Sequence, residues 1–190
     1  MLTDPPPRTT SLREKFLASE RLGTLAVPQD HRLREAANAI ESGMQSGGAV
    51  SVRQACAEFL SVASDFYNVR PPLIRVLAAR PLRVREAGGA IELFGDYHPE
   101  TLVIRLWMRT AIRKQVTSFG TFLSTLCHEF CHHLDCQRLG FPDSWHTRGF
   151  YERTAMLYHH ARGSPMKRLF WVRTSGQRWR IDWPRTNRGR

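Results

Sequence analysis

The segment TFLSTLCHEFCHHLDCQRLGFPDSWHTRGFYER, residues 121–153, decides the fold. It contains His128-Glu129-Phe130-Cys131-His132, which matches the pattern H-E-x-x-H. Two residues four apart on an α-helix lie on one face, about one turn apart. Two imidazoles placed in this way can bind one zinc ion at about 2.0–2.1 Å each. The segment therefore predicts a helix that carries two ligands of a metal ion.

Glu129 directly follows the first of these histidines and can face a zinc-bound water. It would then act as a general base, taking a proton as the water attacks a polarised carbonyl. A catalytic zinc also needs a third protein ligand and one open position. His146, fourteen residues after His132, is the candidate for the third ligand.

The residues before the motif indicate that this helix is mostly buried, because Phe119, Phe122, Leu123 and Leu126 form an apolar run. Imidazole and carboxylate groups on a buried helix need partners, and a metal ion supplies one. The alternative is a solvated helix face on which the histidine spacing is accidental.

Two residues compete with His146 for the third position. If the last helix begins at Trp145, His146 and Glu152 lie about 240° apart around its axis, so only one can face the zinc. Glu152 follows Arg148 by four residues, a pair typical of an exposed face, which favours His146 and leaves Glu152 as the alternative ligand. Asp135, one turn beyond the second histidine, is better placed to accept a hydrogen bond from an imidazole N–H.

Other polar residues near the motif are given lesser roles. Tyr151 and Arg153 are candidates to stabilise a tetrahedral oxyanion. His133 is one residue away from the ligand face and is expected at the surface or behind the ligands. Cys131 is interpreted as a small core residue, and His98 as a surface residue in a loop.

The segment resembles the SprT-like zinc metalloprotease family, which includes the Spartan-type proteases. In that family the H-E-x-x-H helix is followed by a loop and a third histidine in a pattern like H-G-x-x-[FW]. Here the matching residues are His146-Thr147-Arg148-Gly149-Phe150, with the glycine two residues later. Strand-like segments precede the motif in a similar order: LIRVLAA (73–79), AGGAIEL (87–93) and LVIRLW (102–107).

The resemblance covers roughly residues 50–162. It implies His128, His132 and His146 as zinc ligands and Glu129 as the catalytic residue of a peptidase. Many members of the family also carry a zinc ribbon with paired C-x-x-C motifs, and this chain has none.

The whole pattern predicts an α+β, zincin-like single domain. It has N-terminal helices, a small and mostly antiparallel sheet, the H-E-x-x-H helix and a final helix. We expect a flexible segment at 1–29, with residues 1–10 disordered, then the metallopeptidase domain at 30–165 and a separate tail at 166–190. The expected helices are 11–22, 30–44 capped by Asp30, 51–67 and 109–116, and the expected strands are 73–79, 90–94 and 102–107.

The loops and helix ends follow from turn-forming and capping residues. Gly88-Gly89 predicts a turn, and residues 95–99 predict a loop. The H-E-x-x-H helix would begin after Ser118 or Thr121 and end near Gly140, and Asp143 or Ser144 would cap a final helix that runs to about residue 162.

Composition limits the classes of protein to consider. The chain has 190 residues, of which 42% are hydrophobic, enough for a core. No run of eighteen apolar residues predicts a membrane span, and no secretory signal is visible. The four cysteines, at positions 56, 127, 131 and 136, form no C-x-x-C pair and are interpreted as reduced thiols of a cytoplasmic protein. The sequence does not indicate an oligomeric state.

The tail at 166–190 suggests an anionic partner. The net charge of the chain is +11, and residues 161–190 hold nine basic residues and one acidic residue. Trp171, Trp179 and Trp183 alternate with arginine, so rings could stack on bases while arginines contact phosphate. The same residues also predict a β-hairpin around Thr174-Ser175-Gly176 that packs on the domain, with the last five residues disordered.

Two functions from different classes therefore stay open, and a third option is a regulatory or latent protease with a very narrow substrate. The first is a zinc metallopeptidase that hydrolyses peptide bonds in protein or peptide substrates, including proteins bound to nucleic acid, with Glu129 as general base. The second is a nucleic-acid-associated binding protein whose zinc site is structural or vestigial.

Overall fold

The computed structural model describes residues 1–84 and 90–189. The chain forms two compact units: Pro28–Leu134, here called the helix–sheet unit, and Met1–Val27 together with Asp135–Arg190, here called the hairpin unit. The sequence predicts a single domain at 30–165 between a flexible segment and a tail, so the observed division is different. The physical reason is that both of those outer segments pack with the residues that follow Leu134, as described below.

In the helix–sheet unit, helices α2 (Arg32–Ser46) and α3 (Ala49–Tyr67) pack against each other. Both present the apolar face that the sequence predicts. The cap residue of α2 is His31, so the predicted cap Asp30 is one residue too early. Asp30 still accepts a hydrogen bond from the backbone N–H of Arg32 at 3.1 Å, which satisfies a donor at the start of the helix. Helix α2 ends where Gly47 adopts a left-handed backbone with φ of 73°.

The main sheet contains strands β1 (Leu73–Ala79), β5 (Val103–Arg109) and β4 (Gly95–His98), in that spatial order. Strands β1 and β5 are parallel and β4 is antiparallel to β5, so the sheet is mixed and the expectation of a mostly antiparallel sheet is wrong. Parallel neighbours need a crossover connection, which residues 80–102 supply. The predicted loop at 95–99 is also wrong for its first four residues, because these pair with β5 as strand β4.

A second, two-stranded ladder joins β2 (Leu82–Val84) to β3 (Ala90–Glu92) in antiparallel register. It confirms the first part of the strand predicted at 90–94. The predicted turn at Gly88-Gly89 lies outside the described residues.

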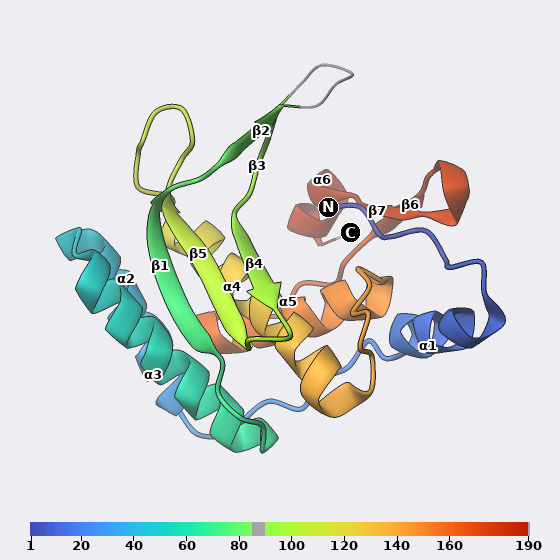
Figure 1. The fold of residues 1–190 in the computed structure, drawn as a ribbon, viewed down its shortest axis with the longest axis horizontal. Coiled ribbons are helices and arrows are strands. Elements are labelled where there is room, and N and C mark those ends of the chain that lie inside the picture. Colours follow the sequence, from blue (N-terminus) through green and yellow to red (C-terminus); the bar gives the residue numbers. More distant parts are fainter. Residues whose placement is uncertain (85–89, 190) are drawn as a thin grey trace. The chain divides into compact units, whose positions relative to one another are not determined.

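The core of this unit lies between the sheet and the helices. Helix α3 packs against β1, and α4 (Phe119–Leu134) packs against β4 and β5 (Figure 1). Ile104 and Leu106 of β5 are fully buried, as are Leu123 and Leu126 of α4. These contacts fix the helix that carries the H-E-x-x-H motif against the sheet.

Residues 109–116 are not the basic helix that the sequence predicts. Arg109 ends β5 and forms an isolated antiparallel bridge with Val116, and Thr117 N–H donates to Met108 C=O at 2.8 Å. The chain therefore turns back on itself, because pairing with the end of β5 satisfies backbone groups that a helix would satisfy internally.

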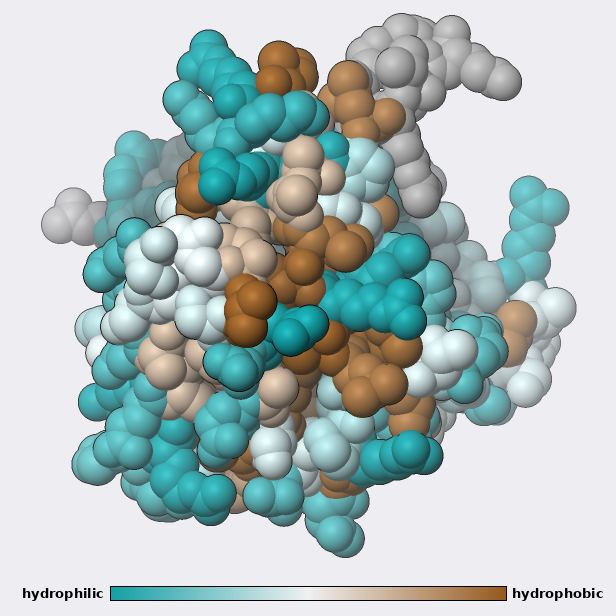
Figure 2. Space-filling model, turned by 60° about the vertical axis from the view of Figure 1, so that its left-hand side comes forward, coloured by the Kyte–Doolittle hydropathy of each residue, from teal (hydrophilic) through white to brown (hydrophobic). Residues whose placement is uncertain are grey.

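Apolar side chains also reach the surface of the helix–sheet unit. On the face displayed in Figure 2 they form patches interrupted by hydrophilic side chains. Among the side chains that the structure describes in this unit, the most exposed large apolar ones are Ile112, at 74%, and Leu73 on β1, at 68%. Strand β1 lies at one edge of the three-stranded sheet, so Leu73 marks an edge that a further strand could cover.

In the hairpin unit, helix α1 (Thr10–Arg21) packs against α5 (Arg148–Arg162). Gly149 in the first turn of α5 makes this packing possible. A Cβ at this position would lie 2.7 Å from the carbonyl oxygen of Leu22 and 3.0 Å from that of Glu20. Any larger residue would push the start of α5 away from the end of α1.

The hairpin predicted in the tail is present as β6 (Trp171–Arg173) and β7 (Trp179–Ile181). The first residues of the chain lie beside it (Figure 1), because Thr3 N–H donates to Trp179 C=O at 2.8 Å and Leu2 bridges Arg180. The structure therefore differs from the expectation of disorder over residues 1–10.

The expectation of disorder over the last five residues differs too, because helix α6 (Trp183–Arg188) extends into them. None of the helices in the described part of the chain is long and apolar enough to cross a membrane.

Candidate metal centre

Helix α4 carries the two histidines of the H-E-x-x-H motif on one face. The helix begins after Ser118, whose hydroxyl accepts a hydrogen bond from the N–H of Thr121 at 3.3 Å. The Nε2 atoms of His128 and His132 are 3.2 Å apart. Two atoms each about 2.0–2.1 Å from one tetrahedral zinc ion are about 3.3–3.4 Å apart, so this spacing suits a shared ion.

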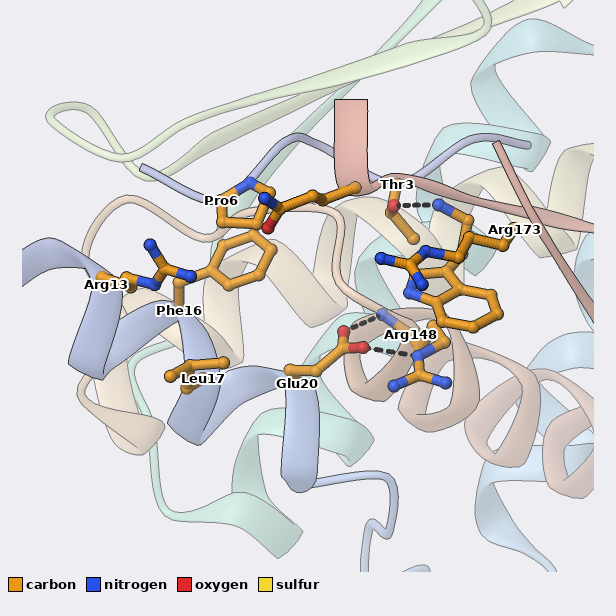
Figure 3. Close-up of a pocket in the computed structure, with 10 residues that line it drawn as sticks. Thr3, Pro6, Arg13, Phe16, Leu17, Glu20, Arg148 and Arg173 are labelled. Carbon is orange, nitrogen blue, oxygen red and sulfur yellow. Dashed lines mark hydrogen bonds and ion pairs between the residues drawn. The ribbon is translucent and has the colours of Figure 1, made fainter. Parts of the chain in front are cut away.

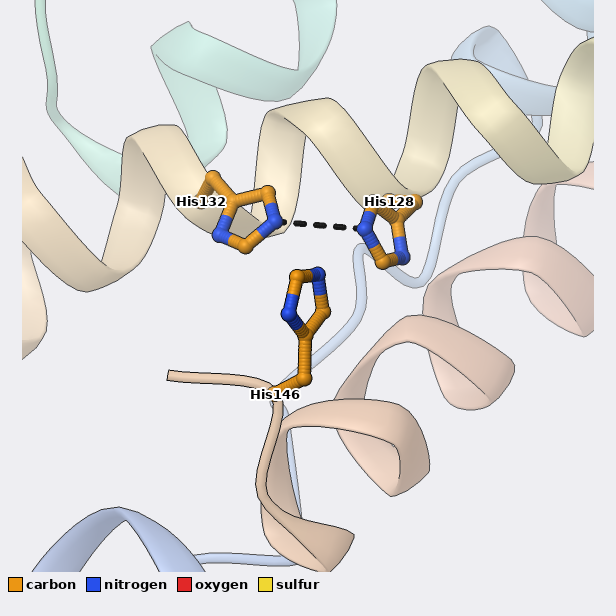
Figure 4. Close-up of side chains that lie close together, drawn as sticks. All are labelled: His128, His132 and His146. Carbon is orange, nitrogen blue, oxygen red and sulfur yellow. Dashed lines mark hydrogen bonds between the residues drawn. The ribbon is translucent and has the colours of Figure 1, made fainter. Parts of the chain in front are cut away.

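His146 completes a group of three histidines that could hold a metal ion. One ligand atom from each of His128, His132 and His146 lies within 4.8 Å of the others, and all three residues are partly buried (Figure 4). Glu152 is not a member of this group.

Glu129 lies beside the first histidine in a buried environment. The residue is 5% exposed, and burial, with a smaller contribution from the negative charge of Asp96, raises its pKa to about 8. Gly95 of β4 leaves space for it: a Cβ at position 95 would lie 3.0 Å from Oε1 of Glu129 and 2.6 Å from Cγ2 of Thr125. The close approach of β4 to α4 therefore shapes the surroundings of this carboxylate.

His146 lies just before helix α5. That helix begins at Arg148, where Thr147 is the cap residue and its hydroxyl accepts from Phe150 N–H at 3.0 Å. The predicted caps, Asp143 and Ser144, are therefore wrong. The comparison of directions on a helix starting at Trp145 does not apply either, since His146 is outside the helix.

The backbone and ring of His146 both contact Asp4. Oδ2 of Asp4 lies 2.8 Å from the backbone N of His146 and 3.2 Å from Nδ1 of its ring. Burial alone would raise the pKa of Asp4, but the hydrogen bonds from His146 outweigh it, so that the pKa lies below its ordinary value. Sequence reasoning missed Asp4, because it lies 142 residues from His146 in a segment without any local signal.

The alternative ligand Glu152 is engaged elsewhere in the hairpin unit. Its Oε1 accepts a hydrogen bond from the indole N–H of Trp171 at 3.3 Å. The pair with Arg148 predicted from their spacing is replaced, because Arg148 bonds to Glu20 through both its backbone N–H and its guanidinium (Figure 3).

Asp135 and Arg153 form a buried ion pair. Nη2 of Arg153 donates to Asp135 Oδ1 at 2.7 Å, and the two side chains are 1% and 0% exposed. The hydroxyl of Ser144 donates to Asp135 Oδ2 at 3.0 Å. Burial raises the pKa of Asp135 to about 6, although Arg153 acts in the opposite direction.

These contacts differ from those expected for two of the predicted site residues. Asp135 accepts from an arginine and a serine, where the sequence analysis expects an imidazole N–H. Arg153 also donates to the carbonyls of Ser19 and Leu22 at the end of α1. Its guanidinium is therefore committed to the interior of the hairpin unit and is unsuited to stabilising an oxyanion.

Tyr151 and His133 have structural partners as well. The hydroxyl of Tyr151 donates to Leu2 C=O at 3.2 Å, and its ring stacks on that of His146 with centroids 5.7 Å apart. The predicted oxyanion role of Tyr151 therefore has no support in this geometry. His133 is fully buried, and its two ring nitrogens lie 2.9 Å from the Tyr97 hydroxyl and 2.8 Å from the Arg70 carbonyl. It is a core residue of the helix–sheet unit, not a surface histidine.

A pocket of about 310 Å³ lies elsewhere in the hairpin unit (Figure 3). None of the residues that the sequence analysis assigns to the metal site lines it. Its walls combine aromatic rings with guanidinium groups and contain Phe16, Trp179, Arg13, Arg148 and Arg173.

Comparisons of the chain with protein-family models, with curated proteins and with solved structures gave no match. The resemblance to SprT-like proteases therefore depends on the motif residues themselves.

The Asp135–Arg153 pair gives a stability prediction. Arg153→Met leaves Asp135 buried without its cation, so we expect a loss of about 3–5 kcal/mol in the free energy of unfolding, measured with urea. The double variant Asp135→Leu with Arg153→Met should lose less, because no buried charge remains unpaired.

Arg148→Met is the matched control on the same helix. The side chain of Arg148 is 36% exposed and also pairs with a carboxylate, so its loss should cost about 0–1 kcal/mol. Wild-type stability in Arg153→Met would contradict a structural role for Arg153.

Proposed function

We propose that the chain is a zinc-dependent metallopeptidase of the SprT-like class that its sequence resembles. The observation that carries this proposal is the three-histidine group, with Glu129 directly after the first histidine of the motif. Three imidazole ligands suit zinc and leave a fourth position open, as catalytic sites require.

The chemistry would be divided between the ion and Glu129. A bound zinc ion supplies a Lewis acid and lowers the pKa of water at the open position. Glu129 would take the proton from the attacking water and return it to the leaving amine. Its burial against Gly95 supports this role, because burial favours the protonated form that Glu129 reaches after taking the proton.

The sheet supports a peptide as the substrate. Strand β4 lies at an edge of the three-stranded sheet and packs against α4, the helix that carries Glu129. An edge strand can pair with an extended peptide through its backbone N–H and C=O groups. Strand β4 is therefore the strand that we propose for pairing with the substrate.

The four cysteines fit the proposed cytoplasmic location. All are free thiols, and Cys56, Cys127 and Cys131 are buried. Proteins without disulfides are typical of reducing compartments.

The ligand set is tested by the zinc content of purified protein. We expect one zinc per chain in the wild type, loss of zinc in His146→Ala and retention in Glu152→Ala. Loss in Glu152→Ala alone would identify a different third ligand. A wild-type chain that retains no added zinc would contradict the metal centre.

The role of Glu129 is tested by Glu129→Gln. This variant keeps the shape of the side chain but cannot act as a base, so we expect full zinc content with hydrolysis of a denatured protein reduced by about 10²–10⁴-fold. A Glu129→Gln protein that keeps both zinc and full proteolysis would rule out the mechanism.

The second candidate function, binding of nucleic acid, is favoured by the pocket in Figure 3. This pocket shares part of its wall with a second pocket, since both are lined by Pro6, Arg13 and Gln177. The guanidinium of Arg148 lies over the ring of Trp179 at 4.4 Å. A pocket with cationic and aromatic walls suits single-stranded nucleic acid, because its phosphates can contact the cations while its bases stack on the rings.

Binding of a fluorescent single-stranded oligonucleotide tests this candidate. We expect affinity that falls steeply with salt and is weakened by the double variant Arg13→Ala with Arg173→Ala. Arg34→Ala with Arg53→Ala removes the same charge from exposed positions of the helix–sheet unit. An equal loss of affinity in both double variants would show that only net charge matters. Salt-insensitive binding would contradict the proposed binding of nucleic acid at this pocket.

A further inference from the structure

Asp4 and His146 are joined by three contacts within the hairpin unit. Besides the two contacts of Asp4 Oδ2, at 2.8 Å to the backbone N and 3.2 Å to ring Nδ1, the backbone N–H of Asp4 donates to His146 C=O at 3.0 Å. The carboxylate therefore fixes the backbone and the ring of the same histidine.

The contact with the ring determines which nitrogen carries the proton. A neutral imidazole has one N–H donor and one acceptor nitrogen, and an ionised carboxylate can only accept. Asp4 therefore selects the form of His146 with the proton on Nδ1, which leaves the lone pair of Nε2 for a metal ion. Carboxylates that orient ligand histidines in this way raise metal affinity.

The residues before Asp4 are held firmly enough to place it. Thr3 is 2% exposed, and its hydroxyl accepts from Trp179 N–H at 2.8 Å. Its carbonyl accepts from Arg178 Nε at 2.7 Å, and Met1 C=O accepts from Ile181 N–H at 3.3 Å. Residues 1–3 thus lie along β7, joined to it by backbone hydrogen bonds and by the isolated Leu2–Arg180 bridge.

We propose that Asp4 is a positioning residue for His146, and that the pairing of residues 1–3 with β7 holds it in place. Metal affinity then depends on the contacts of residues 1–3 with β7, so displacing residues 1–3 from the hairpin weakens metal binding. This inference rests on the proposed metal centre, but its first test does not need a metal.

The protonation form of His146 can be read from ¹⁵N chemical shifts of the metal-free chain, with the signal assigned by its loss in His146→Ala. In the wild type we expect the proton on Nδ1. Asp4→Ala should change the populations of the two forms, whereas Asp4→Asn should largely preserve them, because the amide oxygen still accepts a hydrogen bond. A proton on Nε2 in the wild type, or no change in Asp4→Ala, would overturn the proposal.

Zinc affinity, measured by competition with a chromophoric chelator, provides the second test. Asp4→Ala should weaken binding by about 10–100-fold, as for other residues that orient ligand histidines. Asp4→Ala should have no further effect in a His146→Ala background, because its influence acts through that ring. An equal additional loss in that background would show a general structural effect and would count against the proposal.

Thr3→Pro tests the pairing of residues 1–3 with β7. It keeps the carboxylate of Asp4 but removes the N–H that bonds to Trp179 and the hydroxyl that accepts from it, so zinc affinity should fall in the same direction as in Asp4→Ala. If Thr3→Pro keeps the zinc affinity and the urea midpoint of the wild type, the proposed role of the pairing between residues 1–3 and β7 is overturned. If the wild type binds no zinc, the metal centre fails and the ¹⁵N measurement alone decides the orientation of His146.

Discussion

The buried ion pair between Asp135 and Arg153 is the constraint on which the hairpin unit depends. Asp135 immediately follows α4, Arg153 lies on α5, and the same guanidinium reaches carbonyls at the end of α1. The other carboxylate oxygen of Asp135 holds Ser144, two residues before His146. One charged cluster thus connects three helical segments and the loop that leads to the proposed third ligand. A buried pair contributes little net stability but is costly to break, so its main effect is to fix the geometry.

The helices could be predicted because their signals are local. Helix α4 combines a cap at Ser118, an apolar run and a histidine pair at helical spacing, and each signal agrees with the others. The residue types of strand β4 do not predict its structure. Its residues, Gly95–His98, are polar and rich in turn formers, and they are extended because β5 offers hydrogen bonds across the sheet. The turn after Arg109 has the same cause, a tertiary partner that outweighs helix propensity.

The candidate site could likewise be predicted only where its signals are local. The spacing of His128 and His132 fixes their common face on a helix, and the order of residues along the chain points to His146. The start of α5 could not be predicted, because Asp143, Ser144 and Thr147 are all residue types that cap helices. In the structure the hydroxyl of Ser144 donates to Asp135, and Thr147 caps the helix. Asp4 could not be found, because no local pattern connects residues 142 positions apart.

The pairing of residues 1–3 with β7 also determines when His146 becomes oriented during synthesis. Thr3 leaves the ribosome 176 residues ahead of the Trp179 N–H that bonds to its hydroxyl. Contacts with such large sequence separation form late, since a long loop must close before they contribute to stability. The nascent chain therefore contains His128, Glu129 and His132 before Trp179 is available to hold Thr3 and Asp4 in place. The proposed orientation of His146 is thus a property of the finished fold and not of the growing chain.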